Sequence, residues 1–170
     1  MLVRGKTRGW RFSNVHQYHV TLKFLDEIND NQKSEIDSAL KDLMIAGRLE
    51  LSLGHFGLFP LSGPPRVLWL GIEGRESLTE LQRQLEERLE KAGFPKEKRD
   101  FHAHLTLARL SGNADPHALR FFLGTPPGIP GTWPAGTVKL YRSELWPDGP
   151  EYTEIGRYPI LESPGADHGA

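Results

Sequence analysis

Polar and apolar positions along this chain recur with two different periods, which predicts interleaved strands and helices. Residues 19–25 change polarity at every step, as in a strand with one apolar face. Its two faces would carry Val20, Leu22 and Phe24 on one side and His19, Thr21 and Lys23 on the other. We expect a helix next, from N-cap candidates at positions 29–31 to Gly47, because apolar residues recur there at helical spacing. These residues are Ile36, Leu40, Leu43 and Met44.

The middle of the chain predicts two more strands and a second helix. Residues 49–59 and 67–72 are strand-like, and the stretch rich in proline and glycine between them fits either a hairpin or a crossover. Ser77 and Glu80 have capping-box spacing, so we expect a helix to begin there and to end at Gly93. Its apolar side would consist of Leu78, Leu81, Leu85 and Leu89.

The last third again predicts a strand, a helix and further strands. Residues 104–110 are strand-like, and the helix start at Asp115-Pro116 leads into residues 119–123. Residues 138–146 and 152–160 predict an antiparallel pair around a turn at 147–149. We therefore expect a mixed α+β fold of two related halves, in one domain over residues 1–161 with a disordered tail at 162–170.

Composition narrows the functional classes. The 170 residues are 38% hydrophobic and 25% charged, which is typical of one globular domain. We expect a cytoplasmic protein without a membrane segment, because no apolar run approaches the roughly 20 residues that span a bilayer and the first residues lack a signal-peptide core. The absence of cysteine excludes disulfides, thiolate nucleophiles and cysteine-ligated zinc. A net charge of −1 argues against a protein that coats nucleic acid, but not against a site for one nucleotide.

One short motif occurs twice. His19 and Thr21 lie in HVTL, and His104 and Thr106 lie in HLTL. In a strand, residues two apart point to the same face about 6 to 7 Å apart, so each copy would present an imidazole beside a hydroxyl. One imidazole can remove a proton from an attacking water while the other protonates the leaving oxygen, and the threonines can bind phosphate oxygens. This would be metal-free displacement at phosphorus, with histidine's reference pKa of about 6.5 suiting both roles.

Less specific interpretations of these residues also exist. A single His-x-Thr is usually a surface pair on a strand, but a repeat kept only for folding would repeat its apolar residues rather than its polar ones. His16, His19, His102 and His104 could be imagined as a metal site. There is no HExxH motif and no carboxylate adjacent to the histidines, so we expect neither a metal nor a cofactor.

The paired motifs also carry a family resemblance. HVTLKFL and FHAHLTLAR resemble the HxT motifs of the 2H phosphoesterase superfamily, specifically its RNA 2',3'-cyclic phosphodiesterase branch, also called the bacterial and archaeal 2'-5' RNA ligase family. The likeness runs from about Arg8 to Ile160. It implies a bilobal α+β fold with two pseudo-symmetric sheet lobes, helices packed outside and a central groove. It also implies opening of a 2',3'-cyclic phosphate to a 2'-phosphate at RNA or nucleotide ends, with reversible 2'-5' ligation in some members.

The resemblance assigns roles residue by residue. His19 and His104 would be the catalytic pair, and Thr21 and Thr106 the phosphate ligands. Arg109 would also hold the phosphate, although simple alternation from His104 places it on the opposite face unless the strand ends or bulges. Phe56, Phe59 and Trp69 are more commonly core residues, with Phe59 retained as a candidate to stack a base. The basic residues Arg4, Lys6, Arg8 and Arg11 are usually solvated, with contact to flanking phosphates as the alternative.

Two features depart from the family pattern. Ala103 stands where members commonly have proline, which loosens the backbone beside His104. Only 18 residues precede His19, too few for the family's opening strand and helix. We expect a monomer by default. Loss of the opening unit would uncover a sheet edge, and a dimer that covers this edge is the alternative. This loss also keeps open the alternative of a nucleotide- or RNA-binding module that has lost turnover.

Overall fold

The computed structural model has the mixed α+β architecture expected from the sequence, and it describes residues 9–73, 75–112, 114, 116–124, 128, 131–146 and 149–163. The chain forms two units. Unit 1 contains Met1–Thr21, Leu51–Glu73 and His102–Thr132, and unit 2 contains Leu22–Glu50, Gly74–Phe101 and Trp133–Ala170. The units interleave along the sequence, so they are not the two sequence halves that we expected, and both His-x-Thr motifs lie in unit 1.

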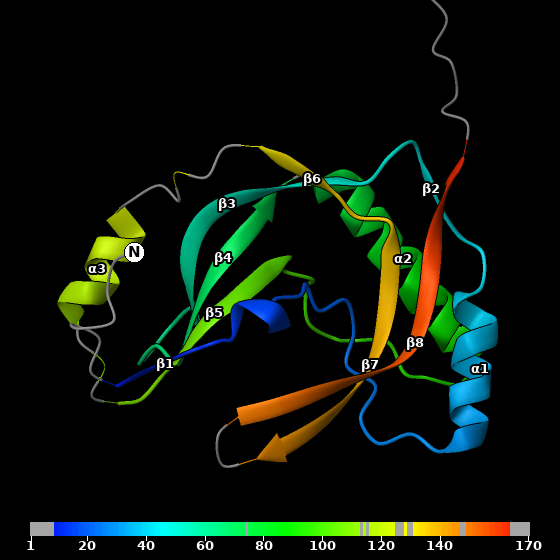
Figure 1. The fold of residues 1–170 in the computed structure, drawn as a ribbon, viewed down its shortest axis with the longest axis horizontal. Coiled ribbons are helices and arrows are strands. Elements are labelled where there is room, and N and C mark those ends of the chain that lie inside the picture. The colour runs from blue at the N-terminus through cyan, green and yellow to red at the C-terminus, as the bar shows by residue number, and fades with distance from the viewer. Residues whose placement is uncertain are drawn as a thin grey trace, which may run out of the picture. The chain divides into compact units, whose positions relative to one another are not determined.

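Unit 1 is built on a sheet in which β1, β5, β4 and β3 pair antiparallel (Figure 1). The strand order is β1-β5-β4-β3-β6. The bounds are β1 Trp10–Phe12, β3 Glu50–Phe59, β4 Val67–Glu73, β5 His104–Leu110 and β6 Thr132–Pro134. Strands β3 and β4 pair antiparallel, which makes them the hairpin rather than the crossover. A 3-10 turn, η1 (Val15–Gln17), follows β1 and leads to the first motif.

The core of unit 1 lies on one face of this sheet only. Leu68 of β4 and Ala108 and Leu110 of β5 are buried with Leu119 of the helix α3 (Pro116–Gly124). Trp10, Phe56 and Phe122 pack around them. The residues of β4 and β5 that alternate with these core positions therefore point to the opposite face of the sheet. Helix α3 does not cover that face.

Unit 2 combines two helices with a three-stranded sheet of order β2-β8-β7 (Figure 1). The bounds are α1 Asp30–Leu40, α2 Arg75–Lys91, β2 Leu43–Ala46, β7 Thr137–Trp146 and β8 Gly149–Ser163. Strand β2 pairs parallel with β8, and β7 pairs antiparallel with β8 as the sequence predicts. Both helices contact this sheet.

The first predicted helix is too long. It begins as expected, with Asn29 as N-cap in a capping box with Gln32, but it ends at Leu40 and not at Gly47. Asp42 has a φ of 57°, a left-handed conformation that stops a helix. Residues 43–46 then alternate buried and exposed, so Leu43 and Met44 belong to strand β2 and face opposite ways. Leu43 and Met44 fall by chance at helical spacing from Leu40, which made the predicted helix too long.

The second predicted helix is confirmed, with Leu78, Leu81, Leu85 and Leu89 all buried. The predicted capping box is wrong, because α2 begins at Arg75, before Ser77. The Glu80 carboxylate accepts from Arg83 and Gln84 further along the helix and not from its start.

The strand predicted at residues 19–25 is also wrong. Only Val20 forms a β-bridge, and residues 21–26 have no regular secondary structure. Phe24 is 74% exposed, whereas the side chain of Lys23 is only 5% exposed. Lys23 donates to the Glu86 carboxylate at 2.6 Å and to the Pro95 carbonyl at 2.7 Å. These partners on α2 and on the loop that follows it hold Lys23 inside unit 2, so the segment does not continue as a strand.

The remaining predicted elements agree with the structure. Strand β5 and helix α3 lie where expected. Strand β8 includes Glu162 and Ser163, the first two residues of the expected tail, because they pair there with β2. Residues 147–148 and 164–170 are outside the described residues. In the described part of the chain, no helix is long and apolar enough to cross a membrane.

Candidate active site

The two His-x-Thr motifs lie side by side in unit 1. Val20 and Leu105 form an antiparallel bridge, which places His19 opposite Thr106 and Thr21 opposite His104. Residues that flank a bridged pair point to the face opposite that pair, so the four motif side chains share one face. His19 and His104 are then diagonal neighbours, about 7 to 8 Å apart by general sheet geometry. That spacing leaves room for a phosphate between the rings.

Each imidazole is fixed by the same local interaction. Nδ1 of His19 lies 2.7 Å from the carbonyl oxygen of Gln17, and Nδ1 of His104 lies 2.6 Å from that of His102. A carbonyl oxygen only accepts, so each Nδ1 carries its proton and donates it. Nε2 is consequently the nitrogen that can take up or release a proton at the site. His102 thus contributes its carbonyl rather than its exposed ring.

Aromatic rings surround His104. Its imidazole lies 5.1 Å from the Phe59 ring in an edge-to-face arrangement and 6.1 Å from the ring of Trp69. The Trp69 indole covers Gly57 across the hairpin, where a Cβ atom would overlap it. His104 pairs with Gly71, which also has no side chain. Phe59 therefore lies beside His104 on the motif face, whereas Phe56 belongs to the core on the other face.

Arg109 reaches the motif face through a β-bulge. Leu68 pairs with Ala108 and Trp69 pairs with Thr106, so Leu107 is an extra residue in β5. Leu107 and Ala108 both pack toward the core, and alternation resumes one residue later. Arg109, opposite Val67, is then on the same face as Trp69 and Thr106. Arg109 could share the face of His104 only if the strand ended or bulged before it, and the structure has this bulge.

Sequence reasoning missed some residues of this face. Arg11 is the cross-strand partner of Arg109, and it was not distinguished from its basic neighbours; of these, Arg4, Lys6 and Arg8 are outside the described residues. The carbonyls of Gln17 and His102 leave no side-chain signal, because every residue has one. The sequence contains the glycines that lie against Trp69, Gly57 in HFGLF and Gly71 in LWLGI. Their contact with the indole can be deduced only once the strand register is known.

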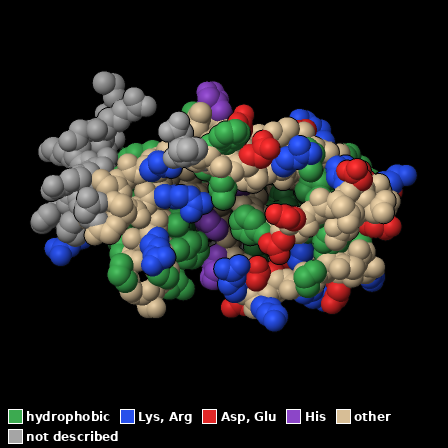
Figure 2. All heavy atoms as spheres, turned by 90° about the horizontal axis from the view of Figure 1, so that it is seen from below, with side chains coloured by type: hydrophobic (Ala, Val, Ile, Leu, Met, Phe, Trp, Pro, Cys, Tyr) green, Lys and Arg blue, Asp and Glu red, His purple; other side chains and the backbone are tan. Residues whose placement is uncertain are grey.

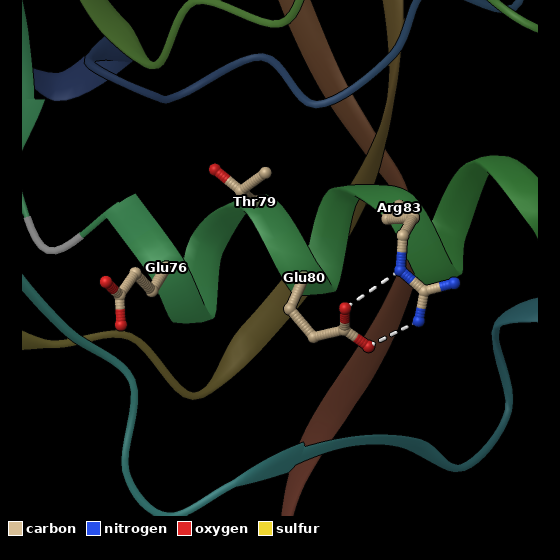
Figure 3. A pocket seen from close by; sticks show the side chains of 4 residues that line it. All are labelled: Glu76, Thr79, Glu80 and Arg83. Atoms are coloured by element: carbon tan, nitrogen blue, oxygen red, sulfur yellow. Dashed lines mark hydrogen bonds and ion pairs between the residues drawn. The ribbon is translucent and has the colours of Figure 1, made fainter.

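One surface depression in the described part of the chain is lined by an ordinary helical ion pair. This depression, on α2, is lined by Glu76, Thr79, Glu80 and Arg83 (Figure 3). Hydrogen bonds from Arg83 and Gln84 lower the pKa of the Glu80 carboxyl to about 2, which is the signature of an exposed ion pair along a helix. Among the described residues, no three or more His, Cys, Asp or Glu side chains gather as metal ligands would.

Comparison with known proteins identifies the family. The model of the 2'-5' RNA ligase superfamily matches residues 7–145. The chain belongs to this superfamily. A relative from Methanothermobacter thermautotrophicus, named RNA 2',3'-cyclic phosphodiesterase, is 33% identical over 147 residues, or 85% of this chain and 79% of that protein. A Thermus thermophilus protein of the same name is 34% identical over 175 residues, covering 94% of this chain and 80% of the relative.

Solved structures of the superfamily agree in fold. A crystal structure of a Thermus thermophilus protein matches 91% of this chain and 84% of its own, with a TM-score of 0.74 and 29% sequence identity. Apo LigT of E. coli matches 91% of this chain and 82% of its own, with a TM-score of 0.71 and 24% identity. The family resemblance and the α+β fold class expected from the sequence are confirmed.

Proposed function

We propose that this protein is an RNA 2',3'-cyclic phosphodiesterase that opens a terminal cyclic phosphate by acid-base catalysis between His19 and His104. The observation that carries the proposal is the duplicated arrangement of these rings, each held through Nδ1 by the carbonyl two residues before it. The names of the relatives support the substrate class. The family expectation is a product that ends in a 2'-phosphate.

The reaction needs one neutral and one protonated imidazole. Nε2 of the neutral ring takes a proton from water as its oxygen attacks phosphorus. The bond between phosphorus and O3' breaks, and the protonated ring gives its Nε2 proton to O3'. Water thereby adds across one P–O bond, with no change in oxidation state and with the charge balanced between the two rings. Either histidine can be the base, since Nδ1 of each donates to the same kind of group, a backbone carbonyl two residues earlier.

The threonines and Arg109 suit the charge that develops on phosphate. Thr21 and Thr106 lie on the same face as the histidines, so their hydroxyls can donate to the non-bridging oxygens. Arg109 adds a guanidinium on that face, beyond Thr106 along β5. We assign Phe59 to stacking against the terminal base, because its partly exposed ring lies beside His104.

Related interpretations share the same residues. Ligation of 2'-5' ends is the same attack at the cyclic phosphate with a ribose 5'-hydroxyl in place of water: the bond from O5' to phosphorus forms, the bond from phosphorus to O3' breaks, and O3' takes the proton. We include it as a second reaction of the site. The alternative from another class is a nucleotide- or RNA-binding module without turnover. A cytoplasmic location, a monomeric state and RNA ends as partners stay predictions, which fractionation, sedimentation and substrate profiling would check.

The direct test is hydrolysis of an RNA oligonucleotide with a 2',3'-cyclic phosphate end, in excess EDTA. We expect wild-type activity to survive EDTA and to fall by about 10²- to 10⁴-fold in both His19→Ala and His104→Ala. His16→Ala is the matched control, since His16 is exposed and lies in η1, outside both motifs. Full activity of either motif variant would overturn the mechanism. Saturable binding of the oligonucleotide without hydrolysis at any pH would favour the binding module.

A further inference from the structure

Two arginines face each other across the strand pair β1-β5. Arg11 pairs with Arg109, and hydrogen bonds from Ser13 N to Leu107 O and from Ser111 N to Gly9 O flank this pair two residues away on each side. Hydrogen-bonded pairs alternate in an antiparallel ladder, so Arg11 and Arg109 form such a pair, with Cα atoms about 5.5 Å apart. Like charges directly opposite each other destabilise a sheet. Two guanidinium groups therefore lie close together at this place on the sheet, which favours an anion there.

The arginine pair lies on the motif face but away from the threonine pair. Arg109 is three residues beyond Thr106 in β5, which corresponds to at most about 10 Å of extended chain. Arg109 can reach back toward the phosphate between the histidines, whereas Arg11 is one strand further out, on β1. Arg11, with Arg109 between it and the reacting phosphate, can hold a second phosphate beyond the one that reacts.

The surface there is hollowed, and the described residues that line it include no carboxylate. A depression of about 390 Å³ is lined by Gly9, Trp10, Arg11, Arg109, Leu110 and Ser111, none of which is a carboxylate. Within the described part of the chain, Arg109 forms no ion pair with a carboxylate. On the face of the molecule in view, Figure 2 shows histidine side chains next to lysine or arginine side chains.

We propose that Arg11, together with Arg109, binds the phosphodiester on the 5' side of the nucleotide that carries the cyclic phosphate. This inference rests on the proposed function. The cyclic phosphate occupies both O2' and O3', so the rest of an RNA chain continues only through O5'. The subsite makes the enzyme select RNA ends over free cyclic nucleotides.

The test compares three substrates with the same base: a nucleoside 2',3'-cyclic phosphate, its 5'-phosphorylated form, and a dinucleotide with a 2',3'-cyclic phosphate end. We expect Arg11→Met to lower the ratio of kcat/KM for the dinucleotide to that for the unphosphorylated nucleotide by about tenfold. The 5'-phosphorylated form should show a loss similar to the dinucleotide, and Arg11→Lys should lose less because it keeps the charge. Higher salt should narrow the difference between wild type and Arg11→Met.

Arg120→Met is the matched control, since Arg120 is an exposed arginine of unit 1 on α3, the helix that packs on the core side of the sheet. Its ratio should equal that of wild type. An unchanged ratio in Arg11→Met, with hydrolysis of the unphosphorylated nucleotide intact in wild type, would overturn the subsite and leave the proposed function standing. If wild type hydrolyses none of the three substrates, the proposed function is wrong and the subsite falls with it.

Discussion

The first and second His-x-Thr motifs share a local arrangement but are supported by different parts of the chain. His104 belongs to β5, a strand paired on both edges, and its ring packs against Phe59 and Trp69. His19 is exposed and follows a 3-10 turn, and its motif touches the sheet at the single bridge of Val20. In both, however, Nδ1 meets the carbonyl two residues earlier.

This difference distinguishes the repeated motif residues from the residues that hold each motif in place. In the proposed mechanism, the repeated sequence HxTL supplies the groups that would contact the substrate, namely an imidazole and a hydroxyl on one face. The support of each copy comes from residues outside the repeat: aromatic rings and small residues of the hairpin for the second motif, and the ion pair of Lys23 just after the first. Changes to the motifs should therefore have similar effects in the two copies, and changes to their supports should not.

The largest stability effect is expected at the anchor that follows the first motif. Lys23→Met leaves the Glu86 carboxylate, 10% exposed, without its cation, so we expect the free energy of unfolding to fall by about 3 to 5 kcal/mol. Glu86→Leu in the same chain should recover much of this loss, because no buried charge then stays unpaired. Urea unfolding measures both variants. Lys33→Met, which breaks an exposed pair with Asp37, is the control, and an equal loss there would contradict the account.

The two threonines should matter equally for catalysis. Thr21→Val and Thr106→Val each remove one hydroxyl donor to the phosphate, and we expect kcat to fall by about 10²- to 10³-fold in either variant. Steady-state kinetics on the cyclic-phosphate oligonucleotide gives the comparison. Thr79→Val changes an exposed threonine on α2 and should have no effect. If one motif variant kept wild-type kcat, the motifs would not be equivalent halves of one phosphate site.

A change under Trp69 should disturb the second motif alone. In Gly57→Ala the new Cβ overlaps the indole ring, which must move away from its position beside His104. We expect a loss of about 1 to 3 kcal/mol in unfolding free energy and altered NMR signals of the His104 ring, with those of His19 unchanged. Gly112→Ala is the control in the same unit, because its Cβ would meet no atom within 4 Å. Equal shifts of both imidazoles would show that the supports are shared.

The smallest effect is expected in unit 2. The Tyr158 hydroxyl donates to Asp37 at 2.6 Å, and Tyr158→Phe should cost about 1 kcal/mol without changing kcat. Hydrogen bonds from Lys33 and Tyr158 lower the pKa of Asp37, so this stabilisation is present above the reference aspartate pKa of about 3.9 and is lost as pH falls through the lowered value. Burial, followed by the Asp37 contact, raises the pKa of Tyr158, so the stabilisation is lost only as pH rises through that value. Urea titrations should show a smaller difference between wild type and Tyr158→Phe at pH 3 than at pH 7.

How far the sequence predicts the fold depends on the reach of the interactions. Helix α2 and the pair β7-β8 were predictable, because their apolar periodicity and turn residues are local. The end of α1 was not, since Leu43 and Met44 fit a helical stripe until the pairing of β2 with β8 separates their faces. The strand prediction at residues 19–25 was wrong for the same reason, because the structure there depends on a distant partner. Its partner, Glu86, is 63 residues away from Lys23.

For the candidate site, the sequence indicated the side chains that we propose as reactive, but not their surroundings. His19, Thr21, His104 and Thr106 were found because polar residues repeat at equal spacing. The position of Arg109 depended on a bulge at Leu107, which is defined only by the register between β4 and β5. Arg11 and Arg109 pair although they are 98 positions apart in the sequence (109 − 11 = 98), and no local sequence pattern predicts this pairing.

The most direct test of the central claim, that the two imidazoles act as one base and one acid, is the pH profile of kcat/KM for the cyclic-phosphate oligonucleotide. Wild type should give a bell-shaped profile, because the rate requires one neutral and one protonated ring. His19→Asn and His104→Asn should each lose one limb of the bell from their residual activity, and the lost limbs should be opposite. Loss of the same limb in both variants, or a wild-type profile without two limbs, would contradict the paired-histidine mechanism.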